Sequence, residues 1–367
     1  MAGGSWDPLV DEVRAGIYIN FITRAGVVIT SGERGIVAMP ITSYPVALTP
    51  KTVYEITSAA EARTLLGDDS GPVELAFRGA TAYGTRRPLP GANKVLVYTM
   101  PEFSADTSVA DYDAMRATLD VYKFDMFVFA EEVTSSEQDK TRAWCIDNRE
   151  NEGKHFLVVY GSSNATDQDV TLTKAVLTRL ADEYSIVAVS GGYLDNVLYS
   201  SAQAAPWFAG LIAGAPLNRA ITYAQSPFVE VNKRHKDSVI VDLLSSGALL
   251  LVNDSKRVKI ERGITSNKAK IRKVKVKLAV ATDLKETAEE NYIGELDNVI
   301  DGQKALLAGI KAYLEVMRDN NIITGDITVE LDPERESVGD KVYVFIKFIE
   351  ADSMEEIYFT IETSAVN

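Results

Sequence analysis

The chain has 367 residues, of which 46% are hydrophobic and 25% charged, and this composition predicts a globular protein of about two domains with short terminal arms. A net charge of −14 excludes a broad basic surface for nucleic acid or anionic membranes, and no apolar run reaches the roughly 20 residues that cross a bilayer. The single cysteine, Cys145, excludes an intrachain disulfide and is interpreted as a small packed hydrophobe.

The N-terminal part predicts an arm over residues 1–25 and a small mixed α/β region over residues 26–92. The arm contains an alternating, β-branched and aromatic run that predicts a strand, made by Ile17, Tyr18, Ile19 and Phe21. Short strands are expected at 36–39 and 53–56. A helix is expected next, with Ser58 as its N-cap and Glu61 in the capping-box position.

Residues 93–215 predict a small doubly wound α/β domain. Its apolar strands are expected at 95–98, 124–129, 156–160 and 186–189, and its helices near 109–122, 136–151, 169–184 and 202–213. Short, nearly all-apolar strands separated by amphipathic helices are typical of parallel strands that are covered on both faces. In the last helix, the small residues Gly210 and Gly214 predict close packing on another element.

Residues 216–350 predict an α+β domain, and residues 351–367 a C-terminal arm. The alternation of Val274, Val276, Leu278 and Val280 with lysines predicts a strand with one buried face. A helix with an apolar stripe is expected at 301–318, and strands at 327–331 and 342–349. The arm predicts a last strand whose apolar side is formed by Ile357, Phe359 and Ile361.

A search for catalytic chemistry finds none in the sequence. The two histidines, His155 and His235, and one cysteine cannot supply a Cys/His metal cluster, and no P-loop or nucleophile motif is present. The strand-to-loop junctions after Tyr160 and Val189 are small and polar, but they are more typical of tight turns than of a ligand site. The sequence therefore predicts no catalytic residue, cofactor or metal.

Two features of the chain point to a partner rather than to a substrate. The terminal strands either complete the chain's own sheet or pair with another chain, and the pattern alone favours neither. Three cations spaced seven residues apart fall nearly in line on the helix at 301–318, where they face either solvent or an acidic partner: Lys304, Lys311 and Arg318.

Several ordered motifs carry a family resemblance from residue 209 to the C-terminus. Residues 209–216 read AGLIAGAP, residues 258–266 read VKIERGITS, residues 292–298 read YIGELDN, and residues 352–361 form a closing strand segment. This series resembles the contractile tail sheath proteins of bacteriophages and phage-tail-like bacteriocins, in the shorter group typical of Firmicutes prophages. Three positions depart from the family pattern: Ala15 stands where Pro is common, Thr265 where Asn is usual, and Glu295 where Lys is usual.

The resemblance implies a structural protein, not an enzyme, in a virion or tail-like particle that is made in the bacterial cytoplasm. It implies a helical tube of hexameric rings around an inner tail tube, which contracts to drive that tube through a cell envelope. The partners would be other sheath subunits, the tube, baseplate and tail terminator proteins, with no nucleic acid, membrane insertion or cofactor.

The resemblance also assigns roles to the parts of the chain. Residues 93–215 would be an outer domain and residues 216–350 the assembly domain, and both arms would add strands to neighbouring subunits, with flexible joints at Gly16, 23–26 and 351–353. A separate hypothesis is that Lys304, Lys311 and Arg318, which we call the basic line, face an acidic inner tube. The alternative is an α/β nucleotide- or small-molecule-binding enzyme with an appended oligomerisation domain.

Overall fold

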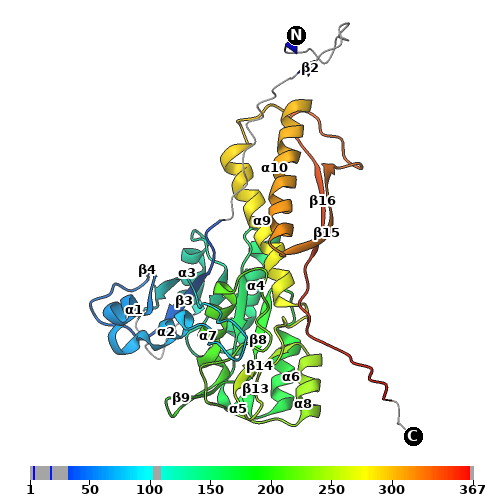
Figure 1. Ribbon diagram of the computed structural model, residues 1–367. Coiled ribbons are helices and arrows are strands. Elements are labelled where there is room, and N and C mark those ends of the chain that lie inside the picture. The colour runs from blue at the N-terminus through cyan, green and yellow to red at the C-terminus, as the bar shows by residue number, and fades with distance from the viewer. Residues whose placement is uncertain (1–2, 5–16, 19–31, 102–108, 364–367) are drawn as a thin grey trace. The chain divides into compact units, whose positions relative to one another are not determined.

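The structure is a computed structural model that describes residues 3–4, 17–18, 32–101 and 109–363 (Figure 1). Its contacts divide the chain into two units. The larger unit comprises residues 31–283, 320–324 and 350–367, and the smaller unit comprises residues 1–30, 284–319 and 325–349. Each unit is described separately below.

The larger unit is built on a seven-stranded mixed sheet in the order β12-β8-β7-β6-β3-β5-β4. Neighbouring strands are parallel except for the antiparallel pair of β4 with β5. Every residue of β3, β7 and β8 is buried, as expected for strands that are covered on both faces. The strands are β3 (Ile36–Ile41), β4 (Val53–Ile56), β5 (Lys94–Thr99), β6 (Met126–Val128), β7 (Leu157–Tyr160), β8 (Ser185–Ala188) and β12 (Ala248–Leu249).

Helices cover both faces of this sheet. The step from β3 to β5 runs toward one edge, and the steps from β5 through β6 and β7 to β8 run toward the other. Because parallel crossovers are right-handed, the two directions place their helices on opposite faces. The helices are α1 (Ala59–Leu66), α2 (Gly71–Phe77), α3 (Val109–Leu119), α4 (Ser135–Asp147), α5 (Asn164–Asp167), α6 (Val170–Arg179) and α7 (Ser201–Gly214), with a 3₁₀ turn at Gly67–Ser70 and a π turn at Asn148–Glu152.

Helix α7 packs on α2 and across β3, β6 and β7, and its small residues make this possible. A Cβ added at Gly210 would lie 1.8 Å from the carbonyl oxygen of Ala76, and one at Gly214 would lie 1.8 Å from that of Gly91. The predicted close packing of these glycines is confirmed. The predicted N-cap is confirmed too, since the Ser58 side chain accepts a hydrogen bond from the Glu61 N–H.

The remaining elements of the larger unit are short. β10 (Val197–Tyr199), β9 (Gly192–Leu194) and β11 (Glu230–Val231) form an antiparallel sheet, and β13 (Leu251–Asn253) pairs antiparallel with β14 (Val258–Ile260). Helix α8 spans Asp237–Ser245. No helix within the described ranges is long and apolar enough to cross a membrane.

The strand predicted at residues 274–280 is wrong, because this segment is part of helix α9 (Ile271–Asn291). Alternation also places Val274 with Leu278, and Val276 with Val280, four residues apart, so the pattern fits two adjacent rows of a helix. All four side chains are buried. A run of 21 residues without glycine or proline favours the helix over a strand.

The smaller unit contains helix α10 (Ile300–Asp319), the end of α9, and most of β15 (Ile323–Leu331) and β16 (Val344–Glu350), which form a two-stranded sheet. The buried stripe of α10 comprises Gly309, Ile310, Tyr313, Leu314 and Met317. Along β16, half-buried and exposed residues alternate, and Phe345 and Ile349 are exposed. β1 (Gly3–Gly4) and β2 (Ile17–Tyr18) also pair, in parallel.

Candidate functional site

The C-terminal tail, residues 351–363, is the most unusual surface feature of the larger unit. It has no helix or strand of its own (Figure 1). Its first residues sit in a cluster of cations that we call the basic socket, formed by Arg262, Lys270, Arg272 and Lys273. The tail is therefore attached to the body at its beginning and leaves it afterwards.

Ion pairs and hydrogen bonds fix the first half of the tail. The Nζ of Lys270 lies 2.7 Å from Oδ1 of Asp352, and the Nζ of Lys273 lies 3.1 Å from its Oδ2. Arg272 donates a hydrogen bond of 2.9 Å to the hydroxyl of Ser353. These contacts argue against the flexible joint predicted at residues 351–353, because that segment is held by three side chains.

Glu355 and Glu356 complete the contacts of the socket. Arg262 lies 3.3 Å from Glu355 and 3.2 Å from Glu356, and Lys270 lies 3.4 Å from Glu355. The hydroxyl of Thr222 donates a hydrogen bond of 2.9 Å to Glu355, whose side chain is only 8% exposed. A nearly buried carboxylate with two cations beside it is a firm anchor rather than a solvated charge.

The local charges explain why the tail binds here. Lys270 and Lys273 flank the N-terminus of α9, where the helix dipole disfavours cations, so carboxylates from the tail offset an unfavourable arrangement. Partial burial alone would raise the pKa of Asp352, but hydrogen bonds from Lys270 and Lys273 outweigh it and lower the pKa to about 2. Asp352 is therefore ionised at neutral pH.

Beyond Glu356 the tail exposes large apolar side chains. Ile357 is 59% exposed, Tyr358 88%, Phe359 81% and Ile361 81%. In the described part of the chain, none of these residues belongs to a strand, so the predicted strand at 357–361 is not formed within this chain. Four large apolar residues exposed within five positions mark a surface that is used for association.

The N-terminal arm is described in part. Ile17 and Tyr18 form β2, with Gly3 opposite Ile17 and Gly4 opposite Tyr18, whereas Ile19 and Phe21 lie outside the described residues. The joints predicted at Gly16 and at 23–26 also lie outside them.

The body begins after the arm with a buried contact. The amide of Gly32 donates a hydrogen bond of 3.2 Å to Asp283, and Arg34 forms an ion pair with the same carboxylate, whose side chain is 1% exposed.

The predicted basic line lies on α10. Lys304, Lys311 and Arg318 are all exposed, and Arg318 follows Lys304 by 14 positions, which is about 21 Å along the helix. Glu315, which is half-buried, falls between Lys311 and Arg318 on the same helical row. Within the described ranges, no carboxylate forms an ion pair with any of the three cations.

The loops after β7 and β8 do not form a ligand site. A Cβ at Gly161 would lie 2.3 Å from the amide nitrogen of Ala202, and one at Gly191 would lie 2.0 Å from the carbonyl oxygen of Tyr199. These glycines therefore allow the backbone near the start of α7 to approach closely. Asp167 fills the same region and accepts hydrogen bonds from the Ser201 amide and hydroxyl at 2.7 and 2.6 Å.

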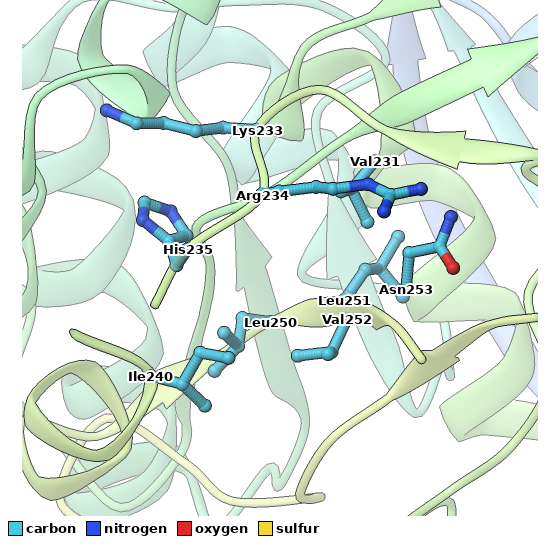
Figure 2. A pocket seen from close by; sticks show the side chains of 9 residues that line it. All are labelled: Val231, Lys233, Arg234, His235, Ile240, Leu250, Leu251, Val252 and Asn253. Atoms are coloured by element: carbon cyan, nitrogen blue, oxygen red, sulfur yellow. The ribbon is translucent and has the colours of Figure 1, made fainter. Parts of the chain in front are cut away.

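Figure 2 shows a cavity of about 220 Å³ that lies between β11 and β13. The side chains of Lys233 and Arg234 point in opposite directions from it, so their charges do not converge on a ligand. Arg234 forms an ion pair with Glu230, and Lys233 donates to the carbonyl of Gln168. Burial, and then the charge of Lys233, lower the pKa of His235, which therefore is neutral at neutral pH.

The other chemistry-bearing side chains of the described residues are structural. Cys145 is buried, its thiol lies 3.4 Å from the Phe156 carbonyl oxygen, and burial raises its pKa to about 12, so it is not a thiolate at neutral pH. His155 contacts the hydroxyl of Tyr184 at 3.2 Å. No group of three His, Cys, Asp or Glu side chains in the described ranges could hold a metal ion.

Sequence reasoning missed the basic socket. Arg262, Lys270, Arg272 and Lys273 are about 80 to 90 positions away from the tail residues they hold, and nothing local marks them. One pair of features could have pointed to it. The four cations fall within 12 consecutive positions of an otherwise acidic chain, and an Asp-x-x-Glu-Glu run precedes the apolar residues near the end.

Two family models match adjoining parts of the chain. Residues 105–266 match the phage tail sheath protein central domain, and residues 265–364 match the phage tail sheath C-terminal domain. The tail sheath protein of Clostridium phage phiCD119 is 26% identical over 355 residues, which covers 93% of this chain and 89% of that protein.

Solved structures share the fold. The sheath tail protein of Desulfitobacterium hafniense is 18% identical with a TM-score of 0.68, covering 91% of this chain and 100% of that one. The helical sheath of the anti-feeding prophage in its contracted state is 11% identical with a TM-score of 0.70, covering 97% and 100%. The chain thus belongs to the phage tail sheath protein family, and it is a structural subunit of the contractile sheath of a phage tail or tail-like particle rather than an enzyme.

Proposed function

We propose that the C-terminal tail and the N-terminal arm are strands donated to neighbouring subunits, and that this exchange links the sheath into hexameric rings around an inner tail tube. The observation that carries the proposal is the contrast within the tail, which is clamped up to Glu356 and exposes Ile357, Tyr358, Phe359 and Ile361 after it. In the N-terminal arm, Ile17, Tyr18, Ile19 and Phe21 take the same role.

Strand addition suits these side chains. An added strand gains main-chain hydrogen bonds along its length, and alternate side chains enter the partner's apolar surface. Alternation places Ile357, Phe359 and Ile361 on one side of an added strand, and burying each of them contributes roughly 1.5–3 kcal/mol, which offsets part of the entropy cost of ordering the tail. The two-stranded sheet of β15 and β16, with Phe345 and Ile349 exposed, offers a partner edge in every copy.

We propose that residues 216–350 form the assembly domain, together with the arms at 1–25 and 351–367. We propose that the α/β part of the chain, whose sheet joins the strands of residues 93–215 to β3 and β4 of the region 26–92 and to β12, takes the outer position. During contraction the rings rotate and widen while the arm connections hold, and the socket keeps each tail fastened to its own body. Baseplate and tail terminator proteins close the two ends of the tube, and the assembly needs no cofactor.

Removing residues 357–367 tests the exchange of the tail. This deletion leaves Asp352, Ser353, Glu355 and Glu356 in the socket, so the chain is expected to unfold at the same temperature as the full-length protein. It is expected to form no tubes under negative-stain electron microscopy, because the donated strand is gone. In the matched control only residues 364–367 are removed, and this shorter deletion is expected to form tubes. Tubes from the longer deletion would refute tail exchange.

The basic line makes a separate prediction about the tube. We propose that Lys304, Lys311 and Arg318 face an acidic surface of the inner tube protein, because they are exposed and form no ion pair among the described residues. Reversing all three charges to glutamate is expected to weaken co-sedimentation of sheath with tube by at least tenfold, without changing self-assembly. Reversal at Lys236, Lys256 and Lys268 is the matched control, and unchanged tube binding by the first variant would contradict the assignment.

A further inference from the structure

A second surface of the larger unit, next to the socket, concentrates arginines in a way that the fold alone does not explain. A small pocket between the turn at residues 83–89 and the segment at 219–225 is lined by twelve residues, of which four are arginine and none is acidic. This composition is unusual in a chain with 52 acidic and 38 basic residues. The pocket arginines are Arg86, Arg87, Arg219 and Arg257.

Two of these arginines have backbone partners that hold them in place. Arg219 donates 2.9 Å hydrogen bonds to the carbonyl oxygens of Pro88 and Arg87, and Arg86 donates a 3.0 Å hydrogen bond to that of Thr222. Neutral carbonyls leave the positive charge of both groups uncompensated. Burial, and then the charges of Arg257 and Arg219, lower the pKa of Arg86.

Arg257 carries the strongest indication of a missing partner. Its side chain is 9% exposed, and its guanidinium lies 3.9 Å from the ring centre of Tyr83. Its Nε and Nη1 atoms are buried and have no hydrogen-bond partner among the described residues, and Nε is 3.8 Å from the nearest Asp254 oxygen, beyond hydrogen-bond distance. Buried donors of a charged group left without an acceptor are costly, so the arrangement calls for an anion.

We propose that this pocket binds a carboxylate side chain from a neighbouring copy of the chain. A guanidinium already oriented by an aromatic ring presents its donors to a carboxylate in the geometry that arginine prefers. The cavity is about 20 Å³, which is room for a group about the size of one water molecule and too small for a nucleotide. In a sheath built from copies with a net charge of −14, carboxylates of other subunits are the most abundant anions at the surface.

The pocket is coupled to the tail through Thr222. The hydroxyl of this residue binds Glu355 of the tail, and its carbonyl binds Arg86 of the pocket. A carboxylate bound in the pocket would therefore be separated only by Thr222 from Glu355, just before the exposed part of the tail begins. The inference rests on the chain being a sheath subunit and does not require the tail to be exchanged.

Cross-linking at position 257 tests the proposal directly. R257K keeps the positive charge, and a carbodiimide then joins the introduced amine to a carboxylate in contact with it. Tubes are assembled from equal parts of ¹⁴N- and ¹⁵N-labelled R257K protein, and mass spectrometry of the linked peptides separates links between chains from links within one. The expected result is a mixed-isotope link from position 257 to one Asp or Glu, present in tubes and absent from the dispersed chain.

Links from position 257 confined to the same chain, for example to Asp254 or Glu362, or no link in tubes, would overturn the proposal. R257Q, which retains stacking on Tyr83, supplies the second measurement, with R78Q on the exposed surface as its matched control. R257Q is expected to unfold at the same temperature as the parent and to need at least tenfold more protein to form tubes. Two other results would also overturn the proposal. An unchanged protein concentration for tube formation by R257Q would indicate that no anion binds there. Stabilisation of the dispersed parent by inorganic phosphate, without any link between chains, would indicate a site for free anions.

The tests of the carboxylate pocket and of tail exchange can succeed or fail independently. If the deletion of residues 357–367 still forms tubes while R257K links between chains, tail exchange fails and the carboxylate pocket stands. If the deletion abolishes tubes and R257Q assembles like the parent, the reverse holds.

Discussion

At the scale of single residues, the tail is held by charge. Asp352 has two cations as partners, and its pKa of about 2 in the folded chain lies below the ordinary value of 3.8. A carboxyl whose pKa is lowered by folding stabilises the protein above its unfolded pKa, and this contribution is lost as the pH falls toward the folded pKa. The anchor is therefore intact at neutral pH and released between about pH 4 and pH 2.

We expect D352N to loosen the beginning of the tail at pH 7, and we expect this effect to shrink as the pH falls toward 2, where about half of Asp352 is protonated in the folded chain. Because the Asp352 side chain is 43% exposed, solvent screens the ion pairs and the loss of unfolding free energy is expected to stay near 1 kcal/mol or below. The measurement is limited proteolysis of the tail together with unfolding free energy across this pH range. D340N, on an exposed loop, is the control, and a difference between D352N and the parent that does not shrink between pH 7 and pH 2 contradicts the assignment.

At the scale of elements, the contact between α9 and α7 depends on one lysine. The Nζ of Lys275 donates to the carbonyl oxygen of Ala215 at 2.6 Å and also to that of Ile212, so it caps the C-terminus of α7. Burial lowers the pKa of Lys275 to about 8, although the charge of Asp125 opposes this shift. The half-buried lysine supplies the donors that carbonyl groups at the end of α7 need.

Replacing this lysine by an apolar residue of similar length is expected to leave those carbonyls without a donor. K275M should therefore lower the unfolding free energy by about 2–3 kcal/mol, measured by urea denaturation at pH 7. K277M, on the same helix as K275M, removes only the exposed ion pair between Lys277 and Glu183. It should change the unfolding free energy by no more than about 0.5 kcal/mol. Equal effects of the two substitutions would show that Lys275 does not cap α7.

Elements of this fold differ in how well the sequence predicts them. The strands of the large sheet other than β12, the cap at Ser58 and the close packing at Gly210 follow from local signals, and the structure confirms them. Helix α9 does not follow from local signals, because valines that alternate with lysines fit a strand and a two-sided helix equally well. The basic socket is not predictable either, since a chain with 52 acidic residues offers Lys270 many partners and only the fold selects Asp352.

At the scale of the whole molecule, net charge opposes assembly. Each subunit carries −14, so copies repel one another until salt screens them. The screening length falls from about 30 Å at 0.01 M to about 8 Å at 0.15 M salt. We expect the protein concentration needed for tubes, measured by sedimentation, to fall over this range. A threshold that rises with salt would show that attractive charge pairs between subunits outweigh the repulsion.

The clamp at Glu356 also sets a tether length. The five residues from Ile357 to Ile361, which carry the exposed apolar side chains, span at most about 18 Å when fully extended. A neighbour can receive this strand only if its sheet edge stays within that radius of the socket in both the extended and the contracted lattice. Lengthening the tether by inserting glycine and serine after Glu356 would permit larger displacements between subunits, and shortening it would restrict how far the sheath can travel before its connections break.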